Sequence, residues 1–391
     1  MSTFTLYLLG AINLGIGIYS LLSTIAYLRY TRRSPGNTPA SGYRPTVALF
    51  VPCCGDEEGL EENLRSLVEQ DYQPLEIIFI VEDEADSAVP VIRRVMETTD
   101  RPAELVTAGI ASGCSQKIHN LLVGLARAKD AEVFAFADSD GITDSAWLVN
   151  LVAALRNPEV GVASSYRFYL PEPGNLASVL RSAWNAGVLT LLGDHDRNFA
   201  WGGAMAIRQE IFRKAEVEQA WQGALSDDYA LTHAVRRAGY RVEFVPRSIV
   251  LSRGKVGLLE LMRWCGRQMA ITRVYWPNLW RLGGGSQVVF VLFLLAGGEA
   301  AVSGDVGVAA ILTVVLLLSW ASGAIRARAV RLLLPRWNDR LRHYYWSYVL
   351  LAPVTSLLTV YAFLTSALSR RIHWRGRVYE MRSPTETVII G

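Results

Sequence analysis

Residues 44–250 alternate short apolar segments with segments of helical periodicity, and this alternation restricts the fold more than any other feature of the chain. Apolar, β-rich segments predict strands at 47–52, 75–83, 131–138, 204–208 and 240–246. Segments with apolar residues at helical spacing lie between them, for example KIHNLLVGLARAK and DDYALTHAVRRAG. The pattern predicts an α/β fold, with a mostly parallel, Rossmann-like sheet covered by helices on both faces.

Acidic residues gather where the predicted strands end. The acidic segments are 56–58, 82–84 and 138–140, and Asp227 and Asp228 begin a later predicted helix. Because ligands of such sheets bind outside the carboxyl ends of the strands, we interpret the acidic ends as parts of one site. Solvated turns and helix N-caps explain single members of the set, such as Asp227.

Asp138 and Asp140 stand one residue apart at the end of a buried strand. Hard cations take carboxylate oxygens, and like charges placed side by side otherwise repel, so the pair predicts a divalent metal site. A loop turn explains the same stretch when it is considered alone.

Three separated acidic groups suit three tasks in one reaction. A nucleoside diphosphate leaving group needs a metal to neutralise it, and a uracil or ribose needs a hydrogen-bond acceptor. An attacking hydroxyl needs a carboxylate to take its proton. The set therefore indicates sugar transfer from a nucleotide sugar.

The N-terminal residues 1–28 contain no charged side chain, and RYTRR follows them directly. About 20 apolar residues cross a bilayer, so this run is long enough. A cleaved signal peptide carries its positive charge before the apolar core, whereas here the charge follows it. We predict a transmembrane helix over 1–33 whose C-terminal flank lies in the cytoplasm.

Further apolar runs occur at 286–303, 306–325 and 346–369. The first two predict a hairpin that returns to a basic flank. The last contains Pro353 and is followed by RRIHWRGR, so both of its flanks favour the cytoplasmic side. Either this run is re-entrant or an earlier span is misassigned, and the sequence leaves both alternatives open.

Leucines and aromatic residues alternate with arginines over 258–282, as is typical of helices that lie in the membrane interface. An ordinary buried helix is the alternative. The predicted regions are an anchor (1–33), a catalytic domain (44–250), interface helices (251–283), a C-terminal transmembrane region (284–369) and a basic tail (370–391).

Charge and cysteine content narrow the partners and the compartment. The 39 basic and 36 acidic residues leave a net charge of +3, which does not favour a nucleic-acid partner. The four cysteines lack paired metal-ligand spacing and fit a reducing, cytosol-facing domain.

Several motifs occur in an order that resembles the ceramide glucosyltransferases, which are membrane-bound inverting enzymes with the GT-A fold. The motifs are VPCCGDEEGLEENLRSLVEQDY, IVEDEADSAVPVIRRV, QKIHNL, FADSD, GGAMAIR, LSDDYAL and IHWRGRVYE. The resemblance implies a UDP-sugar donor, a lipid acceptor in the bilayer, and Mg²⁺ or Mn²⁺. It favours glucose and ceramide, although diacylglycerol and hopanoid glycosyltransferases are similar at these motifs.

The same resemblance implies roles for the aspartates. Asp83 is expected to bind the uridine end of the donor. Asp138 is expected to face the donor and Asp140 to hold the metal, with Asp138 as a second candidate ligand. Asp228 is the expected base that deprotonates the acceptor hydroxyl. Further residues expected at the substrates are Pro52, Gly55 and Glu57 in the uracil loop, Lys117 and Asn120 near the nucleotide, and Asp227.

The family's (Q/R)xxRW element has a changed counterpart here. The string ELMRWCGRQ offers Arg263 and Trp264, preceded by Glu260 instead of Gln or Arg. A second register offers Arg267 and Gln268 without the tryptophan. In the family the arginine supports the donor diphosphate and the tryptophan stacks nearby, so either arginine is a candidate for that role.

Three residues before the predicted strand 204–208 are further candidates. His195 is expected either to contact the acceptor or leaving phosphate, or to be a plain hydrogen-bonding loop residue. Trp201 is a candidate to stack on the sugar or the acceptor, and Gly203 allows a close approach of the backbone.

Two functions of other kinds compete with lipid glycosylation. A processive polysaccharide synthase shares the aspartates, but it normally keeps an intact QxxRW element and more spans. A non-enzymatic membrane protein would concentrate its charged residues within the spans. We therefore predict a multi-pass membrane enzyme with its catalytic domain facing the cytoplasm, in a bacterial inner membrane or a eukaryotic Golgi or ER membrane.

Overall fold

The computed structural model describes residues 2–33, 42–128, 130–172 and 174–390. These form two compact units, which we call the helical unit and the sheet unit. The helical unit comprises Met1–Arg32, Leu170–Leu191 and Lys255–Arg370, and the sheet unit comprises Arg33–Tyr169, Leu192–Gly254 and Arg371–Gly391.

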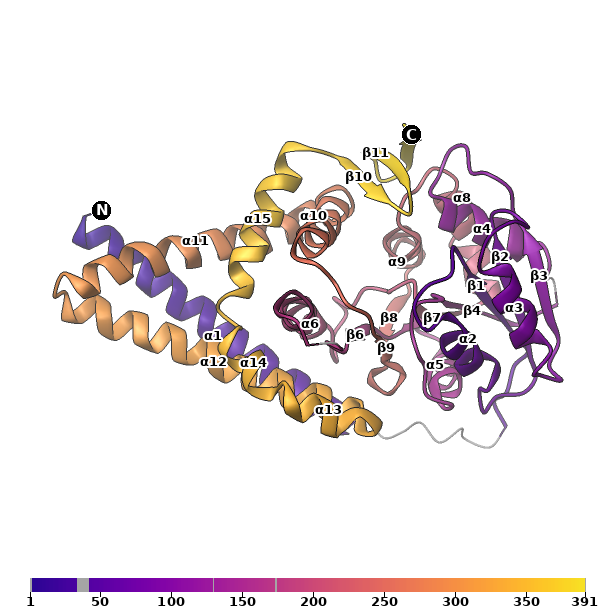
Figure 1. Cartoon of the computed structure of the whole chain (residues 1–391), viewed down its shortest axis with the longest axis horizontal. Coiled ribbons are helices and arrows are strands. Elements are labelled where there is room, and N and C mark those ends of the chain that lie inside the picture. Colours follow the sequence, from indigo (N-terminus) through magenta and orange to yellow (C-terminus); the bar gives the residue numbers. More distant parts are fainter. Residues whose placement is uncertain (1, 34–41, 129, 173, 391) are drawn as a thin grey trace. The chain divides into compact units, whose positions relative to one another are not determined.

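A seven-stranded sheet of order β3-β2-β1-β4-β7-β5-β8 forms the centre of the sheet unit (Figure 1). Its strands are β1 (Val47–Pro52), β2 (Leu75–Val81), β3 (Ala103–Thr107), β4 (Val133–Ala137), β5 (Val160–Ser164), β7 (Ala204–Arg208) and β8 (Arg241–Phe244). β7 runs antiparallel to β4 and β5, and the other neighbours are parallel. The predicted α/β fold with a mostly parallel sheet is confirmed.

The register brings the acidic strand ends to one edge of the sheet. β1 pairs in parallel with both β2 and β4, with Pro52 opposite Ile80 and Phe50 opposite Phe136. Because β7 is antiparallel, the residues before it lie at the same edge as those after β4, and Ala137 pairs with Ala204. The segment Trp201–Gly203 thus joins the acidic edge.

Helices cover the sheet because its strands are apolar on both faces. They are α2 (Leu60–Val68), α3 (Val89–Met96), α4 (Gln116–Leu125), α5 (Trp147–Ala154), α7 (Gln209–Lys214), α8 (Val217–Trp221) and α9 (Asp227–Arg237). Every residue of β4 is buried, as is typical of strands in a covered parallel sheet. Phe136 contributes to the core on one face by packing against Phe50 and Trp221.

Two smaller sheets complete this unit. β6 (Arg167–Tyr169) pairs in parallel with β9 (Val250–Ser252). The chain end forms β10 (Arg371–Trp374), β11 (Arg377–Ser383) and β12 (Glu386–Ile389), an antiparallel sheet in a region described above only as a basic tail. The four cysteines are free thiols.

The helical unit consists of helices in the described residues. They are α1 (Thr3–Arg33), α6 (Leu176–Leu189), α10 (Leu258–Tyr275), α11 (Pro277–Val302), α12 (Val306–Leu333), α13 (Asn338–His343), α14 (Tyr345–Leu350) and α15 (Thr355–Leu368). Within the described residues, α1, α11 and α12 are long and apolar enough to cross a membrane (Figure 1). These three pack together around Leu6, Phe293 and Val308.

The apolar run 346–369 is not one helix. α14 ends at Leu350 and α15 begins at Thr355, with Pro353 between them. The 14 residues of α15 rise about 21 Å, which is less than the roughly 30 Å of a bilayer core. Within the described residues, this run thus contains no single helix long enough to cross a bilayer core by itself.

Candidate active site

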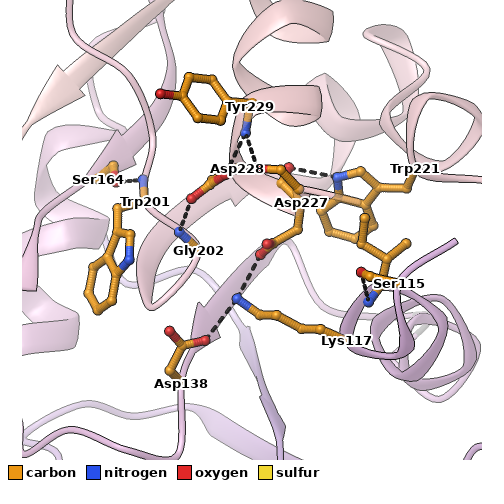
Figure 2. A network of polar contacts seen from close by, with 12 residues as sticks. Ser115, Lys117, Asp138, Ser164, Trp201, Gly202, Trp221, Asp227, Asp228 and Tyr229 are labelled. Atoms are coloured by element: carbon orange, nitrogen blue, oxygen red, sulfur yellow. Dashed lines mark hydrogen bonds and ion pairs between the residues drawn. The ribbon is translucent and has the colours of Figure 1, made fainter. Parts of the chain in front are cut away.

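Lys117 is the central cation of the acidic edge. It lies in the first turn of α4, which Ser115 caps by accepting a hydrogen bond from the amide of Ile118. Its Nζ lies 2.8 Å from Asp138 Oδ1 and 3.0 Å from Asp227 Oδ2, so it joins the end of β4 to the start of α9 (Figure 2). Only 14% of its side chain is exposed. Burial would lower the pKa of Lys117, but Asp138 and Asp227 together raise it.

Arg167 on β6 is a second buried cation of this cluster. Its guanidinium donates to Asp138 Oδ2 at 2.9 Å, and to both carboxylate oxygens of Asp140 at 2.8 and 2.6 Å. The group also lies 4.8 Å from the centre of the Trp201 ring, a cation–π contact. Burial would raise the pKa of Asp138, but the charges of Lys117 and Arg167 lower it. Asp138 is therefore held as a carboxylate, and Arg167 forms an ion pair with Asp140.

The two carboxylates fit a hard divalent cation in their chemistry. Mg²⁺ and Mn²⁺ are commonly held by one or two carboxylates together with oxygens of substrate phosphates. Among the described residues, no group of three or more His, Cys, Asp and Glu side chains is arranged to hold a metal without such help. Because Arg167 contacts both Asp138 and Asp140, a cation there must displace part of its hydrogen bonding.

Asp227 and Asp228 are adjacent, but their surroundings differ. Asp227 is buried, with 6% of its side chain exposed, and pairs with Lys117. Burial raises its pKa to about 6, against the opposing effect of Lys117. Asp228 is partly exposed. Its Oδ1 accepts from the Tyr229 amide at 2.7 Å and from the Ser226 hydroxyl, which orients the group. Its Oδ2 accepts a longer bond of 3.3 Å from Gly202 N (Figure 2).

The turn before β7 approaches these charges closely. A Cβ on Gly202 would collide with Asp227 and Lys117, and one on Gly203 would collide with the Trp201 ring and Asp138. The amide of Trp201 donates to the Ser164 hydroxyl at 2.9 Å, which fixes the turn (Figure 2). Two glycines are therefore needed at this point.

The loops after β1 and β2 are tied to each other and to the chain end. Asp86 Oδ1 accepts from the Gly55 amide at 2.9 Å. Glu57 forms an ion pair with Arg375, and Glu82 forms one with Arg377 at 2.6 Å. Burial and the nearby charge of Asp140 raise the pKa of Glu57, which Arg375 partly counteracts.

The structure brings Lys117, Asp138, Asp140, Asp227, Asp228, Trp201 and Gly203 together, and Glu57 joins them through Arg375 and Asp140. Pro52 ends β1, and Gly55 lies in the loop after it. Asp83 lies in the loop after β2, where Oδ1 accepts from the Ala85 amide at 2.8 Å. Its role in uridine binding stays a prediction.

Within the described residues, no hydrogen bond or ion pair joins Asn120 or His195 to the cluster. Asn120 is buried and accepts a hydrogen bond from Gln116 at 2.8 Å, which is a structural contact. Nδ1 of His195 is buried and has no hydrogen-bond partner within the described residues. The expected contacts of both residues with substrate stay predictions.

The residues expected to support the diphosphate from the (Q/R)xxRW element lie on α10 of the helical unit. They are Arg263, Trp264, Arg267 and Gln268. Trp264 packs edge-on against Trp184, with ring centroids 5.1 Å apart. The role of Arg263 or Arg267 at the diphosphate stays a prediction.

The sequence interpretation missed Arg167 and gave no role to Arg375. Arg167 lies in a strand of three residues, which is too short to show periodicity. Arg375 belongs to the WRGR string, whose plain interpretation was a basic flank. Its ion pair with Glu57 joins residues that are far apart in the sequence, and no local sequence pattern predicts such a contact.

Comparisons with known proteins identify a family and a fold. The family model described as Glycosyl transferase family 21, which includes ceramide glucosyltransferases, matches residues 5–387. A structure of a mannosyltransferase from Pyrobaculum calidifontis, in complex with GDP-Man and Mn²⁺, has a TM-score of 0.51 at 21% identity and covers 89% of this chain and 99% of that one. This similarity shows the fold, and the predicted GT-A fold is confirmed.

Two curated relatives match part of the chain. The poly-beta-1,6-N-acetyl-D-glucosamine synthase of Staphylococcus epidermidis is 20% identical over 244 residues, which are 60% of this chain and 57% of that protein. Ceramide glucosyltransferase 1 of Caenorhabditis elegans is 24% identical over 137 residues, 34% of this chain and 29% of that protein. The chain thus matches less than two thirds of the length of either relative.

Proposed function

The chain belongs to Glycosyl transferase family 21, and from this premise we propose that it transfers a hexose from a UDP-sugar to the hydroxyl of a membrane lipid, with inversion to a β-glycoside. Glucose and ceramide are the proposed donor sugar and acceptor. The observation that carries the proposal is the partly exposed carboxylate of Asp228, oriented beside the Asp138–Asp140 cluster of the same unit.

Asp228 is the proposed base because it is the more accessible of the two adjacent aspartates. Asp227 is buried against Lys117 and therefore serves as a counter-ion. In the proposed step the acceptor oxygen attacks the anomeric carbon, and its proton passes to Asp228 Oδ2. The bond from the anomeric carbon to the β-phosphate oxygen breaks, and the electron pair leaves with UDP. A positioned base of this kind contributes roughly 10²–10⁴-fold to the rate.

The remaining charges are proposed to hold the donor. Lys117 pairs with Asp138, and Arg167 pairs with both Asp138 and Asp140, at the edge where the diphosphate is proposed to bind. Asp140, with Asp138, would hold Mg²⁺ or Mn²⁺, which would supply positive charge to the departing diphosphate. Trp201 presents a ring beside this edge and is proposed to stack on the sugar. Arg263 or Arg267 of α10 is proposed as a further support for the diphosphate.

A lipid acceptor is supported by the membrane character of the chain. Helices α1, α11 and α12 are long and apolar enough to cross a bilayer. The ordered motifs shared with ceramide glucosyltransferases favour an acceptor hydroxyl at the head of such a lipid. We also propose that the sheet unit faces the cytoplasm, where nucleotide sugars are made.

A polysaccharide synthase is the second candidate. The similarity to the poly-beta-1,6-N-acetyl-D-glucosamine synthase extends over 60% of the chain, more than the 34% matched by the ceramide enzyme. Under this alternative the donor is UDP-GlcNAc and the acceptor is the end of a growing glycan.

Product analysis separates the two candidates. Purified protein in detergent is given UDP-glucose or UDP-GlcNAc, with ceramide, diacylglycerol, a hopanoid or a β-1,6-GlcNAc oligosaccharide, and with Mn²⁺ or EDTA. Mass spectrometry is expected to find a mono-hexosyl lipid that forms with Mn²⁺ and is lost with EDTA. Extension of the oligosaccharide would establish the synthase. Absence of any product from all pairs would overturn both candidates.

A further inference from the structure

The C-terminal hairpin carries an arginine in an unfavourable backbone conformation. Trp374 of β10 pairs with Arg377 of β11, so the turn between them consists of Arg375 and Gly376 alone. Both have positive φ, 51° and 77°, as in a type I′ turn. Such turns prefer Asn-Gly, and an arginine in the left-handed region costs free energy. Residues kept in such conformations cluster at functional sites.

The hairpin is fixed to the sheet unit, so the position of its tip is defined. The Tyr379 hydroxyl accepts from the Gln116 amide at the start of α4, at 3.3 Å. Arg377 pairs with Glu82 at the end of β2. The Thr385 carbonyl lies so close to Gly223 that a Cβ there would collide with it. These contacts come from three separate elements of the unit.

The tip places Arg375 at the acidic edge of the sheet. Its guanidinium forms an ion pair with Glu57, and 42% of its side chain remains exposed. The charges of Glu57 and Asp140 raise the pKa of Arg375 against the effect of burial, and Arg375 in turn helps to lower that of Asp138. Arg375 therefore interacts electrostatically with both Asp138 and Asp140.

The ion pair with Glu57 uses only part of the hydrogen-bonding capacity of Arg375. One of the Glu57 carboxylate oxygens meets Arg375, and Oε2 is buried without a hydrogen-bond partner in the described chain. A guanidinium has five donors, and a single carboxylate oxygen leaves most of them available. The planar guanidinium of arginine is well suited to bidentate hydrogen bonding with phosphate.

We propose that Arg375 binds the diphosphate of the nucleotide-sugar donor, and that the C-terminal hairpin exists to hold this residue at the acidic edge. The proposal rests on the proposed sugar transfer from a UDP-sugar. As the bond to the anomeric carbon breaks, negative charge grows on the β-phosphate oxygen, and the fixed guanidinium stabilises it. Glu57 pairs with Arg375 when no donor is present.

The test uses Arg375→Asn, a variant matched to the turn. Asn-Gly is the preferred type I′ pair, so this substitution removes the guanidinium while favouring the hairpin fold. The control is Arg371→Ala, which removes one positive charge from the same hairpin at an exposed pair with Glu380. Calorimetric titration with UDP and with uridine, each with Mn²⁺, gives the preference for the diphosphate, and thermal unfolding is recorded in parallel.

We expect Arg375→Asn to lower the ratio of UDP affinity to uridine affinity about 10- to 100-fold, because one charge-assisted hydrogen bond contributes about this factor to affinity. Thermal stability should not fall. Arg375→Lys should fall between the two, and Arg371→Ala should match the wild type. An unchanged preference in Arg375→Asn would overturn the inference while sugar transfer stands. Equal losses for UDP and uridine with a lower Tm would show a purely structural role. A wild type that binds no UDP and transfers no sugar would overturn the proposed function as well.

Discussion

Replacing Lys117 with methionine tests whether the buried cation holds the acidic edge together. The substitution keeps a long side chain and removes the charge that lies 2.8 Å from Asp138 and 3.0 Å from Asp227. Asp138 keeps Arg167 as a partner, at 2.9 Å. Asp227 forms no other ion pair within the described residues and is almost fully buried, so the loss falls mainly on this carboxylate.

The magnitude follows from the burial of the pair. Removing one partner of a buried ion pair costs about 3–5 kcal/mol, because the other charge is left uncompensated. Asp227 already has a pKa of about 6 with Lys117 present, so without it the group will take up a proton more readily. We therefore expect a loss of about 3–5 kcal/mol at pH 7 and a smaller loss at pH 5, where Asp227 is protonated.

Guanidinium unfolding of the full chain in detergent, followed by tryptophan fluorescence, measures this loss. The double variant Lys117→Met/Asp227→Asn also removes the unpaired carboxylate. It should recover roughly half of the lost unfolding free energy, which is a coupling of about 1–3 kcal/mol between the two residues. Arg382→Met, at an exposed pair with Glu386, is the control and should cost less than about 1 kcal/mol. A single variant as stable as the control, or a double variant no better than the single, would refute the reasoning.

Three further outcomes follow from the same cluster. Folding raises the pKa of Asp227 to about 6, so the folded state disfavours the ionised carboxyl group. The stability that protonated Asp227 contributes at low pH is therefore lost as the pH rises from about 4 to 6. Asp227→Asn should flatten the dependence of Tm on pH over this range. Gly203→Ala places a methyl group against Trp201 and Asp138 and should cost about 1–3 kcal/mol in the unfolding assay, whereas Gly285→Ala, at an open position, should cost far less. Arg167→Gln frees the Asp140 carboxylate and should tighten Mn²⁺ binding without donor, measured by electron paramagnetic resonance; weaker binding would contradict the proposed metal position.

The fold and half of the site were predictable because they depend on regular patterns. Five strands were found from apolar runs, and 204–208 coincides with β7. Parallel pairing of β1 with β2 and β4 then placed their acidic ends at one edge, as expected for ligand sites in such sheets. Strands β3, β5, β6 and β9 were missed because they are short and lie where the sequence shows no clear alternation.

The cations of the site were less predictable than its anions. Carboxylates follow strand ends, which is a local signal, whereas Arg167 and Arg375 reach the site from a three-residue strand and from the chain end. The run 346–369 shows the same limit for membrane helices. Its apolar composition is typical of a transmembrane helix, but the run is interrupted at Pro353. The resulting helix α15 is too short to cross a bilayer core by itself.

The most direct test of sugar transfer by Asp228 is acceptor-dependent release of UDP from a UDP-hexose by the purified chain, compared with Asp228→Asn. The exchange of one carboxylate oxygen for an amide nitrogen removes the proposed base and keeps the shape of the side chain. We expect the lipid acceptor to stimulate release in the wild type. We also expect Asp228→Asn to lower this release at least about 100-fold while UDP binds as before. Acceptor-dependent release by Asp228→Asn at the wild-type rate would show that Asp228 is not the base.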